Sequence, residues 1–193
     1  RGKESKAVID KILKLKNNKI KMINLMGNHD EYMIDFLFNN KNNIESWLNF
    51  GLDQTFRSYG IELVDFIKDG FGDDIIEQLR KKLLNKMSED QINFFKSLEL
   101  SYSSDKYLFV HAGIDPKKEL EDQTKKDFLW SRSKNFFDKN FKSKKIIVHG
   151  HTPEENIVNN AFRINIDSGC YFSGKLSSVC LNDENDDRLF ITT

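Results

Sequence analysis

Apolar side chains in the first half of the chain recur every three or four positions. Residues 5–16 and 74–86 both show this spacing, which is typical of helices with one buried face. Ser88 and Gln91 stand three positions apart just before another apolar run, which is the pattern of a capping box at the start of a helix. We therefore predict that residues 43–98 form a helical block.

Short apolar runs that end beside glycine or beside Asn and Asp indicate strands, and most of them lie in the second half of the chain. A strand-rich centre flanked by helices is an α/β architecture, and this is the predicted fold class. The expected strands are residues 19–26, 106–111, 144–149, 163–167, 175–181 and 188–192.

The composition is that of a globular protein of ordinary polarity. The chain has 193 residues, of which 38% are hydrophobic and 31% charged, and this suits a single domain over residues 1–193. Lys plus Arg and Asp plus Glu are both 30, whereas nucleic-acid binders usually carry a basic excess. No apolar run approaches the roughly 20 residues that cross a membrane. We expect a cytoplasmic protein that binds neither nucleic acid nor membrane.

All four histidines of the chain follow an apolar run and stand beside or near glycine: His29, His111, His149 and His151. Each alone has a purely structural explanation, as a turn residue or as a hydrogen-bonded histidine of the core. The placement of all four at predicted strand ends is harder to explain in that way. Strand-end loops with glycine let the backbone approach a ligand closely. The placement indicates a functional site.

Imidazole is the commonest protein ligand for divalent transition metals, and Asn or Asp oxygens complete such sites. Asn28 offers a neutral amide oxygen, and the adjacent His29 can serve as an acid or a base. The carboxylates of Asp30, Asp115 and Asp167 are available, but they do not form an obvious set for two metal ions.

Five motifs follow one another along the chain: Arg1-Gly2-Lys3-Glu4-Ser5, Gly27-Asn28-His29-Asp30, His111-Ala112-Gly113, Phe128-Leu129-Trp130-Ser131-Arg132 and His149-Gly150-His151-Thr152-Pro153. Their order resembles a known family, the bacterial branch of the phosphoprotein phosphatases within the calcineurin-like metallophosphoesterases. That branch includes phage-type serine/threonine protein phosphatases and, as close relatives, symmetrical diadenosine tetraphosphatases. The resemblance spans residues 1 to about 175.

The resemblance implies a β-sandwich flanked by helices and a site with two divalent metal ions. Manganese is the expected metal, with iron or zinc as alternatives. Asn28, His111 and His151 look like ligands of the second ion, and His29 looks like the general acid that protonates the leaving oxygen. The arginines that match the phosphate-binding positions of the family are Arg1 and Arg132. The resemblance leaves two roles for His149, which is either a metal ligand itself or a residue that supports the ligands from behind.

Two segments of the family pattern do not occur in this sequence. They are Gly-Asp-x-His-Gly and the Gly-Asp-x-x-Asp that precedes the position of Arg1, and in the family they supply the ligands of the first metal. We therefore expect a chain that is partial at its N-terminus, lacks the first strands of the fold and is inactive by itself. A genuinely degenerate relative is the alternative.

Three functions fit this pattern. The first is a metal-dependent phosphomonoesterase acting on a phosphorylated protein or a small phosphoester, most simply a serine/threonine protein phosphatase. The second is a symmetrical dinucleoside polyphosphate hydrolase, for which Trp47, Phe50, Phe56 and Tyr59 could stack a base, although their helical spacing favours a core. The third is a non-catalytic binding module with a phosphatase fold.

Overall fold

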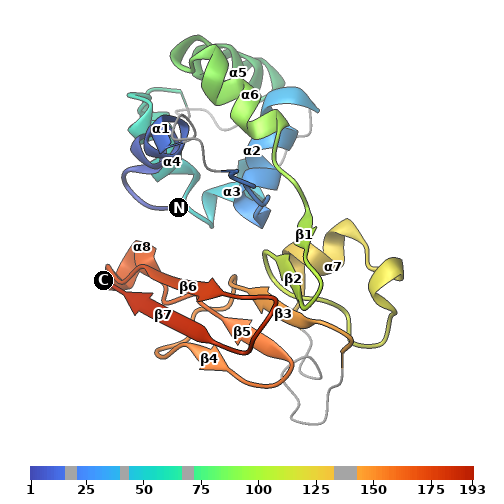
Figure 1. Cartoon of the computed structure of the whole chain (residues 1–193). Coiled ribbons are helices and arrows are strands. Elements are labelled where there is room, and N and C mark those ends of the chain that lie inside the picture. Colours follow the sequence, from blue (N-terminus) through green and yellow to red (C-terminus); the bar gives the residue numbers. More distant parts are fainter. Residues whose placement is uncertain (16–20, 40–43, 67–71, 133–142) are drawn as a thin grey trace. The chain divides into compact units, whose positions relative to one another are not determined.

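The computed structural model describes residues 1–15, 21–39, 44–66, 72–132 and 143–193. These residues form two compact units (Figure 1). The first unit comprises Arg1–Asn24 and His29–Leu98, and the second comprises Leu25–Asn28 and Glu99–Thr193. The single domain expected over residues 1–193 stays a prediction.

The first unit is helical wherever its regular structure is described. The helix predicted over residues 74–86 is confirmed, and so is the capping box, in which Ser88 and Gln91 each accept a hydrogen bond from the backbone N–H of the other. The helices are α1 (Ser5–Leu15), α2 (Asn28–Phe38, of which Asn28 itself belongs to the second unit), α3 (Ile44–Leu48), α4 (Leu52–Ser58), the 3-10 helix η1 (Leu63–Asp65), α5 (Asp73–Lys86) and α6 (Glu89–Lys96).

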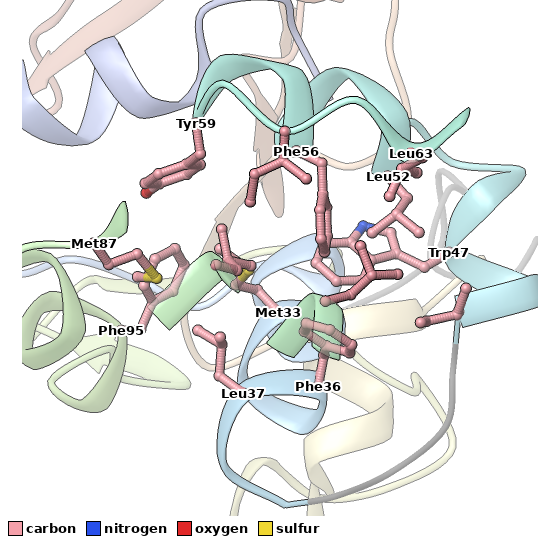
Figure 2. Packing of buried hydrophobic residues seen from close by; sticks show 14 of the residues in the cluster. Met33, Phe36, Leu37, Trp47, Leu52, Phe56, Tyr59, Leu63, Met87 and Phe95 are labelled. Carbon is pink, nitrogen blue, oxygen red and sulfur yellow. The ribbon is translucent and has the colours of Figure 1, made fainter. Parts of the chain in front are cut away.

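These helices bury one hydrophobic cluster, and Figure 2 shows side chains from several of them meeting there. Trp47 and Phe56 are almost completely buried, and their rings meet edge to face at 6.2 Å. Tyr59 is buried in the same cluster, whereas Phe50 is only half-buried. The predicted core role is therefore confirmed for Trp47, Phe56 and Tyr59, which leave no exposed ring face on which a base could stack.

The second unit is built on a five-stranded sheet in the order β1-β2-β3-β5-β4. Its three central strands are parallel, and the two edge strands pair antiparallel to their neighbours. The strands are β1 (Ser101–Ser103), β2 (Tyr107–Val110), β3 (Ile146–His149), β4 (Val158–Asn159) and β5 (Arg163–Asn165), and a separate hairpin consists of β6 (Ser177–Leu181) and β7 (Arg188–Thr192).

Each face of the sheet buries its own cluster, as the alternation of side chains along a strand requires. On one face, Leu108 and Ile147 pack with Phe128 of helix α7 (Lys125–Trp130). On the other face, Val148 and Ile164 pack with residues of the β6–β7 hairpin. The second unit is thus a sheet layered between a helix and a hairpin, and the α/β fold class is confirmed.

The strand predicted over residues 19–26 is wrong for the part that the structure describes. Between residues 21 and 26, only Leu25 forms a β-bridge, with Glu99, while residues 19 and 20 lie outside the described ranges. The chain then turns directly into α2 at Asn28. Among the described helices, none is both long enough and apolar enough to span a bilayer.

Candidate metal centre

The loops that follow the parallel strands bring the histidines of the second unit to one edge of the sheet. His111 follows β2 directly, and Gly150 and His151 follow β3. The carbonyl ends of parallel strands meet at the same edge, which is where α/β proteins place their ligands. The Gly150 N–H donates to the His111 carbonyl at 2.9 Å, so the two loops are held together by the backbone.

Three polar side chains converge at this edge. His111 Nε2 lies 2.9 Å from Asn28 Oδ1 and 3.0 Å from His151 Nδ1. The imidazole rings of His111 and His151 meet at 4.9 Å between centroids. The structure thus brings together the three residues that the family resemblance assigns to the second metal ion, and all three belong to the same compact unit.

Asn28 reaches the site through a short segment that crosses into the second unit. The Met26 N–H donates to the Glu99 carbonyl at 2.8 Å, next to the bridge between Leu25 and Glu99. Asn28 is 4% exposed, so its amide is fixed by the protein around it. An amide oxygen held in this way is a neutral ligand that needs little ordering when an ion binds.

His151 has a left-handed backbone, with φ of 68°, and no other described residue except glycine has a positive φ. The Thr152 N–H donates to the Gly150 carbonyl at 2.8 Å, two residues back, so His151 is the central residue of a γ-turn. Such conformations cost about 1–3 kcal/mol and persist only where neighbouring structure holds them. The turn directs the His151 ring at His111, and the Trp130 ring of α7 meets it edge to face at 6.1 Å.

His149 does not join the convergent side chains. It is 2% exposed, its Nδ1 donates to the Gly150 carbonyl at 3.0 Å, and Arg163 Nη1 donates to its Nε2 at 3.3 Å. Burial lowers the pKa of His149 to about 4, so the ring is neutral near pH 7. Because both ring nitrogens already have protein partners, His149 belongs behind the ligands rather than among them.

His29 and Arg1, the expected acid and one expected phosphate-binding residue, belong to the first unit, where both contact Phe50. The His29 ring meets the Phe50 ring edge to face at 6.1 Å, and the Arg1 guanidinium carbon lies 5.9 Å from the centroid of the same ring. Gly51 has φ of 91°, and a Cβ there would lie 3.4 Å from Arg1. Sequence reasoning considered Phe50 only for base stacking and missed this role.

Arg132, the second expected phosphate-binding residue, is exposed and belongs to the second unit. It stands two residues after Trp130, whose ring contacts His151, and the Ser131 hydroxyl between them donates to the Ile114 carbonyl at 2.7 Å. The Trp-x-Arg segment is therefore anchored beside the convergent histidines. Sequence reasoning quoted Trp130 as part of a motif but gave it no contact.

The donor atoms at this edge fit one transition-metal ion. Two imidazole nitrogens and an amide oxygen are ligands that manganese, iron and zinc all accept. In the described ranges, no group of three or more His, Cys, Asp and Glu side chains converges, and the three residues here include only two of that kind. Asp167 has a structural role, because its Oδ1 accepts from the Gly169 N–H at 2.9 Å.

Comparison with known proteins gives one positive result. The family model described as calcineurin-like phosphoesterase matches residues 1–190, which is nearly the whole chain. No curated protein matches the sequence. The matched range includes the convergent Asn28, His111 and His151, as well as Arg1, His29 and Arg132.

Proposed function

Because the chain belongs to the calcineurin-like phosphoesterase family, we propose that it is a metal-dependent phosphomonoesterase that acts most simply on phosphoserine or phosphothreonine. Membership of the family itself indicates metal-dependent phosphoester hydrolysis. The observation that carries the proposal is the convergence of Asn28, His111 and His151 within 3.0 Å around one nitrogen atom. A merely structural trio would not need a strained backbone at His151.

Asn28, His111 and His151 would hold one divalent ion, with manganese the first choice and iron or zinc as alternatives. When bound, such an ion lowers the pKa of a water molecule and neutralises charge on the phosphoryl oxygens. His29 would donate its proton to the leaving oxygen, a contribution of about 100- to 10,000-fold in rate. Arg1 and Arg132 would bind phosphoryl oxygens, because a planar guanidinium matches them with two parallel hydrogen bonds.

We further propose that carboxylate ligands of another ion lie on a segment that precedes Arg1 in the complete gene product. The motifs that supply them in the family do not occur in the 193-residue sequence. The proposal of a degenerate binding module is less well supported, because Asn28, His111 and His151 keep a ligand-like arrangement.

Hydrolysis of dinucleoside polyphosphates is the weaker enzymatic alternative. It needs a pocket for a nucleoside, and three of the four aromatic residues considered for it are buried in a hydrophobic core. Only Phe50 remains half-buried, and its ring already contacts Tyr32, at 6.2 Å between centroids.

The test is turnover of p-nitrophenyl phosphate by the complete gene product in manganese, compared with its His29→Ala variant. We expect kcat to fall by about 100- to 10,000-fold in the variant, while manganese affinity, measured by titration calorimetry, stays unchanged because His29 is not a ligand. Asn182→Ala, in an exposed turn, is the control and should keep full activity.

Full turnover by His29→Ala would show that His29 is not the general acid. Absence of turnover by the wild type with every divalent metal would overturn the enzymatic proposal. The substrate class is decided by comparing kcat/KM for phosphopeptides and for diadenosine tetraphosphate. A higher value for the dinucleotide would replace the protein phosphatase proposal with its alternative.

A further inference from the structure

Behind His151 lies a group of buried polar side chains that the proposed chemistry does not use. His149, Arg163 and Asn165 are 2%, 6% and 1% exposed. Buried polar groups are costly unless they are hydrogen-bonded, so their partners show what they hold in place. Two of these side chains, His149 and Asn165, donate hydrogen bonds to Gly150 and Thr152, the two residues that flank His151.

The Gly150 carbonyl, on one side of His151, accepts two hydrogen bonds. One comes from the Thr152 N–H at 2.8 Å and closes the γ-turn, and the other comes from His149 Nδ1 at 3.0 Å. Arg163 Nη1 donates to the opposite nitrogen of the same imidazole at 3.3 Å. Because Nε2 accepts this bond, the proton of the neutral ring stays on Nδ1, where it can be donated to Gly150.

The Thr152 carbonyl, on the other side of His151, is also held by a buried side chain. Asn165 Nδ2 donates to it at 2.8 Å, while Asn165 Oδ1 accepts from the Asp167 N–H at 3.0 Å. The amide group of Asn165 is therefore engaged at both ends. Its orientation is fixed, and with it the position of the Thr152 carbonyl.

The parallel pairing of β3 with β5 brings these side chains together. Ile147 pairs with Arg163 and His149 pairs with Asn165. Paired residues of neighbouring strands point to the same side of a sheet, so His149, Arg163 and Asn165 share one face at the end that carries His151. The arrangement depends on the register of β3 against β5. Arg163 and Asn165 come 14 and 16 residues after His149 in the sequence.

The need for such a support follows from the backbone of His151. A residue other than glycine in this conformation is unfavourable by about 1–3 kcal/mol, and a typical hydrogen bond returns about 1 kcal/mol. The γ-turn contains one backbone hydrogen bond, and the Gly150 N–H adds a second bond to the His111 carbonyl. The bonds from His149 and Asn165 to the two flanking carbonyls add further support on both sides of His151.

We propose that His149, Arg163 and Asn165 are positioning residues that hold His151 in its left-handed turn with Nδ1 facing His111. The role as support for a metal ligand rests on the proposed function, whereas the turn itself does not. The competing explanation is that the three residues only satisfy one another inside the sheet. The two explanations differ in what a substitution at His149 does to His151.

Three variants of the complete gene product separate these explanations. His149→Leu removes both hydrogen bonds of the ring, whereas His149→Asn keeps an N–H donor near the position of Nδ1. Val148→Ala is the control, because Val148 is a buried neighbour on the opposite face of the sheet and its truncation weakens the core without touching the turn. Urea unfolding of each variant gives its stability and shows that it is folded.

The first readout is manganese affinity by titration calorimetry. We expect His149→Leu to lose about 10- to 100-fold in affinity, the usual effect of removing a partner behind a metal ligand. His149→Asn should recover most of this loss, and Val148→Ala should bind as the wild type does even if its stability falls as far. Recovery by Asn is the result that a purely structural role does not give.

The second readout needs no metal. Hydrogen exchange of the Thr152 amide, which closes the γ-turn, is compared with that of the Ile147 amide, which donates to the Phe162 carbonyl at 2.9 Å in the same sheet. We expect the ratio of the two exchange rates to rise at least about tenfold in His149→Leu and to stay at the wild-type value in Val148→Ala.

The inference is overturned if His149→Leu shows the same ratio of amide exchange rates and the same manganese affinity as Val148→Ala. That result would leave the proposed function intact. If the wild type binds no manganese but the ratio still rises in His149→Leu, the positioning of His151 stands and the proposed function fails. If His149→Leu does not fold, Asn165→Leu replaces it in both measurements, with the same expected results and the same contrary ones.

Discussion

At the scale of single residues, the backbone of His151 makes a prediction that does not depend on metal. Glycine adopts positive φ freely, whereas alanine meets the same steric penalty as histidine. We expect His151→Gly to be more stable than His151→Ala by about 1 kcal/mol, after the greater flexibility of glycine in the unfolded chain is subtracted. Urea unfolding in the presence of a chelator measures the difference.

Both substitutions remove the imidazole, so they should weaken manganese binding to the same degree. Equal stability of the two variants would show that His151 does not have a left-handed backbone in solution. The comparison would then also remove the reason for a support behind it.

Tyr59 provides a second prediction at this scale, concerning alkaline pH. Its hydroxyl is buried without a hydrogen-bond partner among the described residues, and burial, with a smaller effect of Asp10, raises its pKa to about 12. The unfolded chain loses this proton near the ordinary value of about 10. The folded state therefore holds the proton more tightly, and stability is lost as the pH rises from about 10 to about 12.

Between pH 8 and pH 11, we expect the wild type to lose about 1 kcal/mol more stability than Tyr59→Phe does. Urea unfolding at the two pH values gives this difference. The other ionisable groups are common to both proteins, including Tyr32, whose pKa burial also raises. Equal losses would mean that Tyr59 ionises in the folded state as easily as in water.

At the scale of elements, the capping box of α7 supports the site through Trp130. Thr124 and Asp127 cap the helix reciprocally, and Lys118 Nζ donates to Asp127 Oδ2 at 2.6 Å. Burial acts to raise the pKa of Asp127, but the hydrogen bonds from Lys118 and Thr124 outweigh it and lower the pKa. The carboxylate therefore stays ionised, and its contribution to stability is lost only as the pH falls from about 4 through the lowered pKa.

We expect Thr124→Ala to destabilise the protein by about 1 kcal/mol and to shift the fluorescence of Trp130, because loss of the N-cap loosens the six-residue helix that carries Trp130 at its other end. Ser88→Ala is the matched control, since it removes the equivalent cap of α6 in the other unit. It should lower stability by a similar amount and leave the emission of Trp130 unchanged. An unchanged spectrum in Thr124→Ala would show that the cap does not position Trp130.

Long, periodic elements of this fold could be predicted from the sequence, and short ones could not. Helix α5 was predicted to within one residue, because its apolar face is repeated over several turns. Helix α7 has 6 residues and β4 has 2, which is too short for a period to show. The segment before Asn28 looked like a strand, but only Leu25 of its described residues pairs with another segment.

The candidate site, too, could be predicted from the sequence only in part. His111 and His151 stand at the ends of predicted strands, and the family resemblance pointed to Asn28. The roles of Arg163 and Asn165 could not be inferred, because they depend on which strands are neighbours and in what register. The contact of Phe50 with Arg1 and His29 likewise joins segments whose packing no local pattern indicates.

At the scale of the whole molecule, the two compact units have separate hydrophobic cores. One cluster lies wholly within the first unit, and two lie within the second. Asn28, His111 and His151 all belong to the second unit. An ion that binds only the folded form stabilises whichever unit holds its ligands.

We therefore expect two unfolding transitions in calorimetry. Manganese should raise the midpoint temperature of only one of them, that of the second unit. At a free concentration 100 times the dissociation constant, the stabilisation is about 2.7 kcal/mol. Leu83→Ala, in the core of the first unit, should lower the other transition alone, with a loss of about 2–5 kcal/mol. A single transition that responds to both changes would show that the units unfold as one.

The short strand β3 also limits how the gene can change in length. Its residues alternate between the α7 side and the hairpin side of the sheet, and His151 follows its last residue by two positions. Loss or gain of one codon inside β3 would exchange the two sets of side chains and turn His149 away from Arg163. Insertions between Asn182 and Asp187, in an exposed turn, leave this order intact. Indels among homologues should therefore accumulate in that turn and be absent from β3.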